Sequence, residues 1–184
     1  MIQFLAILAA PLLNLPVIRR IRRNHGLEHA TIHMLSRKQK NLNIAGRSTS
    51  AGFYLYGNVP TAEVEAAAQE ALFRMQHGEH GLAIHPNCGT GLVTAGVLTS
   101  ITALAGTAGM KQSLADRLSR LPTIVLLSTF SLILSQPLGL ALQQHFTTLG
   151  EPGQLEVVAI NRYEFPIPLA GQRLTVHFVR TTQG

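Results

Sequence analysis

Residues 91–110 read GLVTAGVLTSITALAGTAGM, twenty consecutive residues without a charged side chain. Because an α-helix rises about 1.5 Å per residue, this stretch would reach roughly 30 Å, the thickness of the hydrocarbon core of a membrane. Its many Gly, Ala, Ser and Thr residues favour close packing against another helix. The stretch therefore predicts a transmembrane helix.

A second uncharged stretch, Leu121–Leu142, follows and is more apolar, with Pro137 inside it as an expected kink. The charged segment Lys111–Arg120 lies between the two stretches. Two long uncharged runs so close together predict a transmembrane hairpin over residues 91–142. The alternative is a buried helical pair in a soluble protein.

The first eighteen residues form a third apolar segment. Ile2–Ile18 carries no charge, but it is short and contains Pro11 and Pro16. Four arginines follow at once, at positions 19, 20, 22 and 23, and such clusters stay cytoplasmic and bind anionic headgroups. Because no basic region precedes the segment, it is a poor signal peptide. Residues 1–18 are predicted to be a membrane anchor, either spanning or lying in the interface.

The composition supports a membrane protein with a compact polar part. Charged residues make up 13% of the 184 residues, about half of the usual share of roughly 25%. A single cysteine excludes an intrachain disulfide framework. The net charge of +6 comes from basic residues beside the apolar anchor, without interleaved aromatic residues. This pattern favours the lipid bilayer as the partner and argues against nucleic acid.

The hairpin decides which segments share a side of the membrane. It returns the chain to its starting side, so residues 19–90 and 143–184 are expected on the same side. The first of these segments carries nine Lys and Arg against five Glu, which predicts a cytoplasmic location. The segment 111–120 has three basic residues against one acidic residue. This basic excess favours a cytoplasmic location for the segment, which argues against the predicted orientation.

The polar segments predict a membrane α+β protein. Residues 19–90 are expected to form a helix-strand-helix-strand domain with the metal site, and residues 143–184 a β-hairpin packed on it. In the first segment we expect a helix at 24–38 capped by Asn24, a loop at 41–52 and a strand at 53–56. A helix from the N-cap Thr61 to Gln76 and a strand at 82–84 are expected to follow. In the second segment we expect strands at 155–160 and 173–179, joined by the Pro-rich stretch 164–171.

The string His25-Gly26-Leu27-Glu28-His29 lies in the first of these helices. Histidines four residues apart project from the same face of a helix, so His25 and His29 can bind one metal ion. Glu28 can accept a proton from a metal-bound water, as in inverted zinc peptidase motifs. His33 lies roughly 12 Å along the axis from His25, too far to share that ion, although it can pair with His29.

A third ligand is expected from the segment His85-Pro86-Asn87-Cys88-Gly89-Thr90. Either His85 or the thiolate of Cys88, the only cysteine, suits Zn or another divalent metal. The alternative is a buried apolar Cys88 and a polar His85 at a strand end. The remaining histidines and the acidic residues of the second helix are expected to stay outside the site: His77, His80, His145, His177, Glu63, Glu65 and Glu70.

The two motifs together resemble the YqhQ-like family of bacterial membrane proteins, which carry HG-x-EH and HP-x-CGT segments. The whole chain looks more like a sister family of uncharacterised membrane proteins from cyanobacteria and other photosynthetic bacteria. Residues 45–48 and 53–60 support that likeness, which covers roughly residues 20–140. The resemblance implies a metal-dependent enzyme with His25, Glu28, His29, His85 and Cys88 as the shared set, in the bacterial inner or thylakoid membrane.

A fainter similarity links the chain to the insulysin-type peptidases, which also place H-x-x-E-H on a helix before a strand and a helix. Their further helix with a glutamate ligand has no clear counterpart here. Two functions are therefore expected: a membrane-embedded zinc hydrolase, acting on an unknown protein or peptide, or a non-enzymatic accessory protein with a structural metal. Three protein ligands plus water favour the first, and four protein ligands the second.

Overall fold

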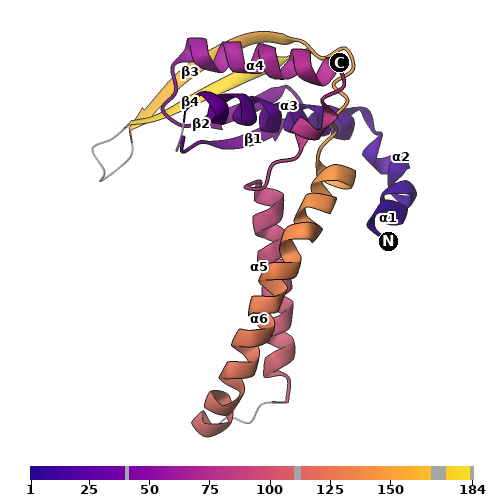
Figure 1. Ribbon diagram of the computed structural model, residues 1–184, viewed down its shortest axis with the longest axis vertical. Coiled ribbons are helices and arrows are strands. Elements are labelled where there is room, and N and C mark those ends of the chain that lie inside the picture. Colours follow the sequence, from indigo (N-terminus) through magenta and orange to yellow (C-terminus); the bar gives the residue numbers. More distant parts are fainter. Residues whose placement is uncertain (40–41, 110–112, 167–172, 183–184) are drawn as a thin grey trace. The chain divides into compact units, whose positions relative to one another are not determined.

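The computed structural model describes residues 1–39, 42–109, 113–166 and 173–182. It divides into two compact units, which are described separately (Figure 1). The first unit comprises Met1–His85 and Gln143–Gly184, and the second comprises Pro86–Leu142.

Helices and a sheet make up the first unit. Its helices are α1 (Ile2–Leu8), α2 (Ala10–Leu13), α3 (Pro16–Lys38), α4 (Thr61–Gln76), the 3₁₀ turn η1 (His80–Ala83) and the π turn η2 (Gln143–Thr147). Its strands are β1 (Ala45–Thr49), β2 (Gly52–Tyr56), β3 (Val157–Pro166) and β4 (Arg173–Thr181). In the described residues these strands form one antiparallel sheet in the order β1-β2-β4-β3.

The expected C-terminal hairpin forms from β3 and β4. It joins the first unit through the pairing of β4 with β2, and β3 is the edge strand on that side of the sheet. Position 53 pairs with 179, and 55 with 177. The N-terminal and C-terminal polar segments thus form one sheet.

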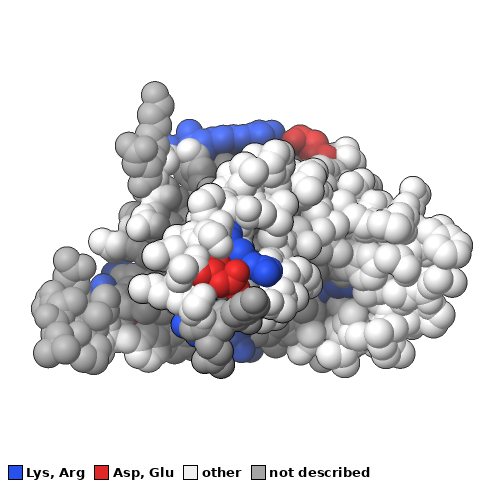
Figure 2. Space-filling model, turned by 90° about the horizontal axis from the view of Figure 1, so that it is seen from below, with Lys and Arg blue, Asp and Glu red and all other residues white. Residues whose placement is uncertain are grey.

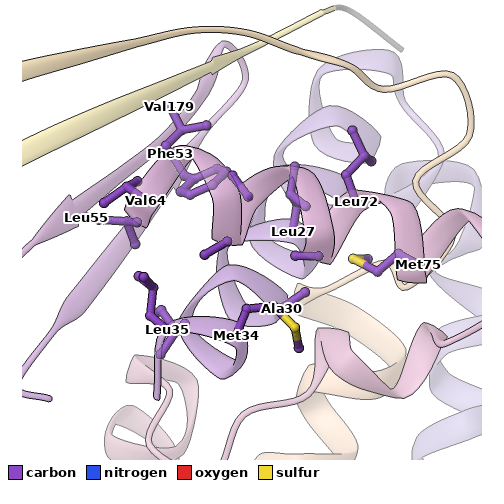
Figure 3. Close-up of a cluster of buried hydrophobic side chains, with 14 of the residues drawn as sticks. Leu27, Ala30, Met34, Leu35, Phe53, Leu55, Val64, Leu72, Met75 and Val179 are labelled. Atoms are coloured by element: carbon purple, nitrogen blue, oxygen red, sulfur yellow. The ribbon is translucent and has the colours of Figure 1, made fainter. Parts of the chain in front are cut away.

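The core lies between this sheet and the helices α3 and α4 (Figure 3). Phe53 and Leu55 on β2 are two residues apart, so both point to the helical face, where each is 0% exposed. Leu27 from α3, Val64 from α4 and Val179 from β4 close the same cluster. Full burial of each such side chain stabilises the fold by about 1.5–3 kcal/mol.

The structure differs from the predicted elements at three places. A loop was expected at residues 41–52, but β1 forms there because it pairs along β2. The expected strand at 82–84 is instead the end of η1 and an extended residue. Thr61 is the first residue of α4 rather than its N-cap, which is Pro60, and its hydroxyl lies 3.1 Å from Nε2 of His177.

Helix α3 begins eight residues earlier than expected, at Pro16, a residue favoured in the first turn of a helix. Asn24 is therefore not a cap but a buried residue in the middle of the helix. Arg22 is buried as well, and its guanidinium donates to the carbonyls of His145 and Thr148, both at 3.1 Å. This arginine stabilises the polar unit and is not available to lipid headgroups.

The first eighteen residues contain two short helices instead of one long one. Helix α1 has 7 residues and α2 has 4, and none of them is buried. Seven residues reach about 10 Å, a third of the hydrocarbon thickness. Neither helix reaches across the hydrocarbon core by itself, and the membrane anchor, spanning or interfacial, remains a prediction.

The second unit is a pair of antiparallel helices, α5 (Gly89–Thr107) and α6 (Leu114–Leu142), which run side by side (Figure 1). The hydroxyls of Thr102 and Ser131 lie 2.6 Å apart across the pair. The predicted charged connection is shorter than expected, because α6 already includes Asp116 and Arg120, whose charged groups lie 3.7 Å apart. Lys111 lies outside the described residues.

Both helices are long and apolar enough to cross a membrane. Only 6% and 11% of their apolar windows are buried, whereas the core helix of a soluble protein is mostly buried. In the space-filling view, most of the described surface on this face is uncharged, and the Lys, Arg, Asp and Glu residues form a few separate patches (Figure 2). These features suggest association with a membrane.

Candidate metal centre

Four imidazole rings of the first unit lie in a continuous row. His25, His29 and His33 are four residues apart on α3, and His85 follows η1. The ring centroids are 4.4 Å apart for His25 and His29, 5.7 Å for His29 and His85, and 4.8 Å for His33 and His85. Donor atoms of His25 and His29 lie within 4.8 Å of one another, a spacing that could hold a metal ion.

Hydrogen bonds to backbone carbonyls fix the tautomers of His25 and His29. Nδ1 of His25 lies 2.9 Å from the carbonyl of Thr147, and Nδ1 of His29 lies 2.7 Å from that of Ala83. A carbonyl oxygen only accepts, so each Nδ1 carries a proton, and in the neutral form of each ring Nε2 keeps its lone pair. Metal-binding histidines in proteins show the same arrangement.

His29 gives the strongest indication of a metal ligand. It is 1% exposed, and its Nε2 is buried without a hydrogen-bond partner among the described residues. A buried acceptor that stays unpaired costs about 1–3 kcal/mol. The lone pair of His29 is therefore suited to a ligand that is not part of the protein.

His33 and His85 complete the row in different ways. Nε2 of His33 lies 2.9 Å from the carbonyl of Ile84, so in this ring Nδ1 keeps the lone pair. Burial, together with the smaller effects of the neighbouring His33 and His29, lowers the pKa of His85 to about 4. His85 is therefore uncharged at neutral pH, as a metal ligand must be.

Glu28 lies where α3 contacts β1. Its carboxylate is 3% exposed and accepts a hydrogen bond from the hydroxyl of Ser48. Gly46 provides the space, because a Cβ at that position would overlap the Glu28 carboxylate. Burial raises the pKa of Glu28, while the Ser48 hydrogen bond and the charge of His25 act in the opposite direction. The carboxylate is held in one orientation by the sheet.

The π turn η2 contacts two of the four histidines, and no sequence motif predicted this contact. Thr147 supplies the carbonyl for His25, and the side-chain oxygen of Gln143 accepts from the backbone N–H of His85 at 2.9 Å. Gln143 is 0% exposed. Because η2 is far from both histidines along the chain, spacing alone could not place it at the site.

Cys88 belongs to the second unit and is the N-cap of α5, where its sulfur accepts from the N–H of Thr90 at 3.4 Å. It follows His85 by three residues, so the two Cα atoms are at most about 11 Å apart along the chain. Its role as a ligand stays a prediction.

Three of the histidines that were expected outside the site have other surroundings. His77 and His80 are exposed at the end of α4 and in η1, and His177 is buried beside Thr61. Glu70 forms ion pairs with Arg74 and Lys38 on the outer face of α4.

The fold and the histidine row define an α+β protein with two apolar helices and a possible metal site. Residues 20–160 match the family described as a domain of unknown function, DUF6391, and the chain belongs to that family. An uncharacterised protein of the cyanobacterium Picosynechococcus sp. is 34% identical over 139 residues, which are 70% of this chain. The chain spans 65% of the length of that relative. No solved structure matches the chain.

Proposed function

We propose that this protein is a membrane-embedded, zinc-dependent hydrolase whose metal ion is bound by His25 and His29. The observation that carries the proposal is the buried Nε2 of His29, which has no partner in the described part of the chain while its Nδ1 is held by Ala83. Zinc binds neutral imidazole nitrogens and thiolates in a tetrahedral arrangement.

Cys88 is the proposed third ligand. Its position three residues after His85 keeps it within reach of the histidine row, and a thiolate is a good zinc ligand. Three protein ligands would leave one coordination position open, and a bound zinc ion would act there as a Lewis acid and lower the pKa of a water molecule to about 7.

Glu28 is the proposed general base. It adjoins His29 in sequence, and Ser48 on β1 fixes its carboxylate. In this position the Glu28 carboxylate would accept a proton from the attacking water. The likeness of the two motifs to YqhQ-like membrane proteins and to the insulysin-type helix supports the same assignment, with a peptide bond as the expected substrate.

Helices α5 and α6 are the proposed membrane hairpin. They expose large apolar side chains, among them Leu92 at 74% and Leu104 at 71%. Such surfaces suit lipid chains better than water. We place the protein in the bacterial inner or thylakoid membrane, with both polar segments in the cytoplasm.

The position of His85 supports a second candidate function, that of an accessory protein with a structural metal site. Its uncharged ring lies between those of His29 and His33. If His85 and Cys88 both bind the ion together with His25 and His29, the site has four protein ligands and no position for water.

Zinc content and turnover test the proposal together. Wild-type protein purified in detergent should carry about one zinc per chain, and His29→Ala should lose most of it. His77→Ala, which removes an exposed histidine, should keep wild-type content. Full zinc occupancy in His29→Ala would exclude the proposed ligand pair.

Glu28→Gln separates the hydrolase from the structural site. The amide is nearly isosteric but cannot accept a proton, so this variant should keep its zinc and lose the turnover that the wild type shows on a library of peptides. A 10- to 100-fold weaker zinc affinity would instead indicate that Glu28 only supports a ligand histidine. Undiminished turnover would exclude the general-base role.

A further inference from the structure

We propose that Gln143 binds an oxygen atom of the substrate at the metal site, through the N–H groups of its side-chain amide. The expected substrate group is a carboxylate or a carbonyl. The inference rests on the proposed metal site and adds to it the residue that orients the substrate.

The orientation of the Gln143 amide is fixed by its partner. The backbone N–H of His85 only donates, so the Gln143 atom 2.9 Å away is the acceptor Oε1. The other atom of the amide is then Nε2, which carries two N–H donors. The assignment of oxygen and nitrogen, which is ambiguous for many glutamines, is thereby settled.

These donors are buried and unsatisfied. Gln143 is 0% exposed, and its Nε2 has no hydrogen-bond partner among the residues that the structure describes. An unsatisfied buried donor costs about 1–3 kcal/mol, and native proteins keep few of them. An acceptor from outside the chain would satisfy it.

The backbone at Gln143 is held in place by the π turn. Its carbonyl accepts from both the N–H and the hydroxyl of Thr148, at 3.0 and 2.9 Å. Four residues on, Thr147 holds His25. Single π turns within or next to α-helices are frequent at functional sites. The turn thus fixes the amide beside His85, whose ring centroid is 5.7 Å from that of His29.

The chemistry of the amide selects the ligand class. Nε2 only donates, so it requires an acceptor, and an oxygen atom that carries negative charge, such as that of a carboxylate, is a stronger acceptor than a neutral one. A buried water could also satisfy the donor. Acetate serves as the probe, because it is a small carboxylate that can bind an open metal position.

The test uses full-length protein in which cobalt replaces zinc, so that acetate binding is followed through the visible spectrum of the metal. Gln143→Met removes the amide without adding charge, and Gln143→Glu keeps an acceptor for the His85 N–H but loses the donor. Gln144→Met, at the exposed neighbouring position, is the matched control. Cobalt content and thermal unfolding are measured for each variant.

We expect both Gln143 variants to bind acetate about tenfold or more weakly, the effect of losing a hydrogen bond to a charged group. Gln144→Met should match the wild type. If Gln143→Met loses cobalt through the His85 contact, Gln143→Glu decides the result.

Wild-type acetate affinity in Gln143→Met would overturn the inference and leave water as the partner of the amide. Wild-type affinity in Gln143→Glu would also overturn it, because only the acceptor towards His85 would then matter. A wild-type protein that binds cobalt but no acetate contradicts the inference alone. A wild-type protein that binds no cobalt contradicts the metal site, and the inference falls with it.

Discussion

At the scale of single residues, hydrogen-bond partners give the histidines of this protein different chemistry. His25 and His29 donate from Nδ1 to backbone carbonyls and keep a lone pair on Nε2. His177 is as buried as His29, but its Nε2 lies beside the hydroxyl of Thr61. The first two are suited to bind a metal, and His177 is a satisfied core residue.

The environment of His177 predicts a pH dependence of stability. Burial lowers its pKa below the ordinary value of 6.5, and the charge of Arg162 adds to the effect. The unfolded chain therefore binds a proton at a higher pH than the folded chain, so this contribution is complete above pH 6.5 and is lost as the pH falls towards the folded pKa.

Urea unfolding of the wild type between pH 7.5 and 5.5 should thus show falling stability. The slope should be smaller in His177→Gln, which cannot be protonated. His77→Gln, at an exposed position, should keep the wild-type slope. The account of His177 is wrong if both variants lose stability with pH as the wild type does.

At the scale of elements, the sequence predicted the helices and strands that are determined by their own residues. The apolar runs predicted α5 and α6, and the aromatic cluster at 53–56 predicted β2. Strand β1 has the sequence Ala-Gly-Arg-Ser-Thr, which has low strand propensity, and it forms only because β2 offers a partner. The extension of α3 back to Pro16 likewise depends on contacts with residues more than a hundred positions away, such as those of Arg22.

Asn24 links three elements and should be important for stability. Its amide nitrogen donates to the carbonyl of Thr49 on β1, and its oxygen accepts from the hydroxyl of Thr181 on β4, both at 2.8 Å. Asn24→Ala should lower the free energy of unfolding by about 1–3 kcal/mol, because buried partners stay unpaired.

Asn58→Ala, at an exposed position, is the control, and it should change stability by less than about 0.5 kcal/mol. Thermal unfolding of both variants measures the difference. Equal stability of the two would mean that these hydrogen bonds do not hold α3 to the sheet.

At the scale of the whole molecule, the chain consists of a polar unit built from both ends and a helical hairpin inserted between them. The motifs predicted His25, Glu28, His29 and His85, and the structure brings all four into the polar unit. Gln143 and Thr147 could not be predicted, because they reach the histidines through folding and not through sequence proximity.

The hairpin predicts the membrane topology. Reporters inserted after residue 40 and at the C-terminus should report the same side of the membrane, and a reporter inserted in the turn between α5 and α6 should report the other side. Opposite locations for the first two reporters would exclude the hairpin. They would also contradict the pairing of β2 with β4, which requires both segments on one side.

The central claim is a zinc ion bound by His25, His29 and Cys88 with one open position. X-ray absorption at the zinc edge of the purified protein measures this ligand set directly. We predict one sulfur at about 2.3 Å, two imidazole nitrogens at about 2.0–2.1 Å and one further oxygen. A zinc ion without a sulfur ligand, or one without imidazole scattering, would contradict the claim.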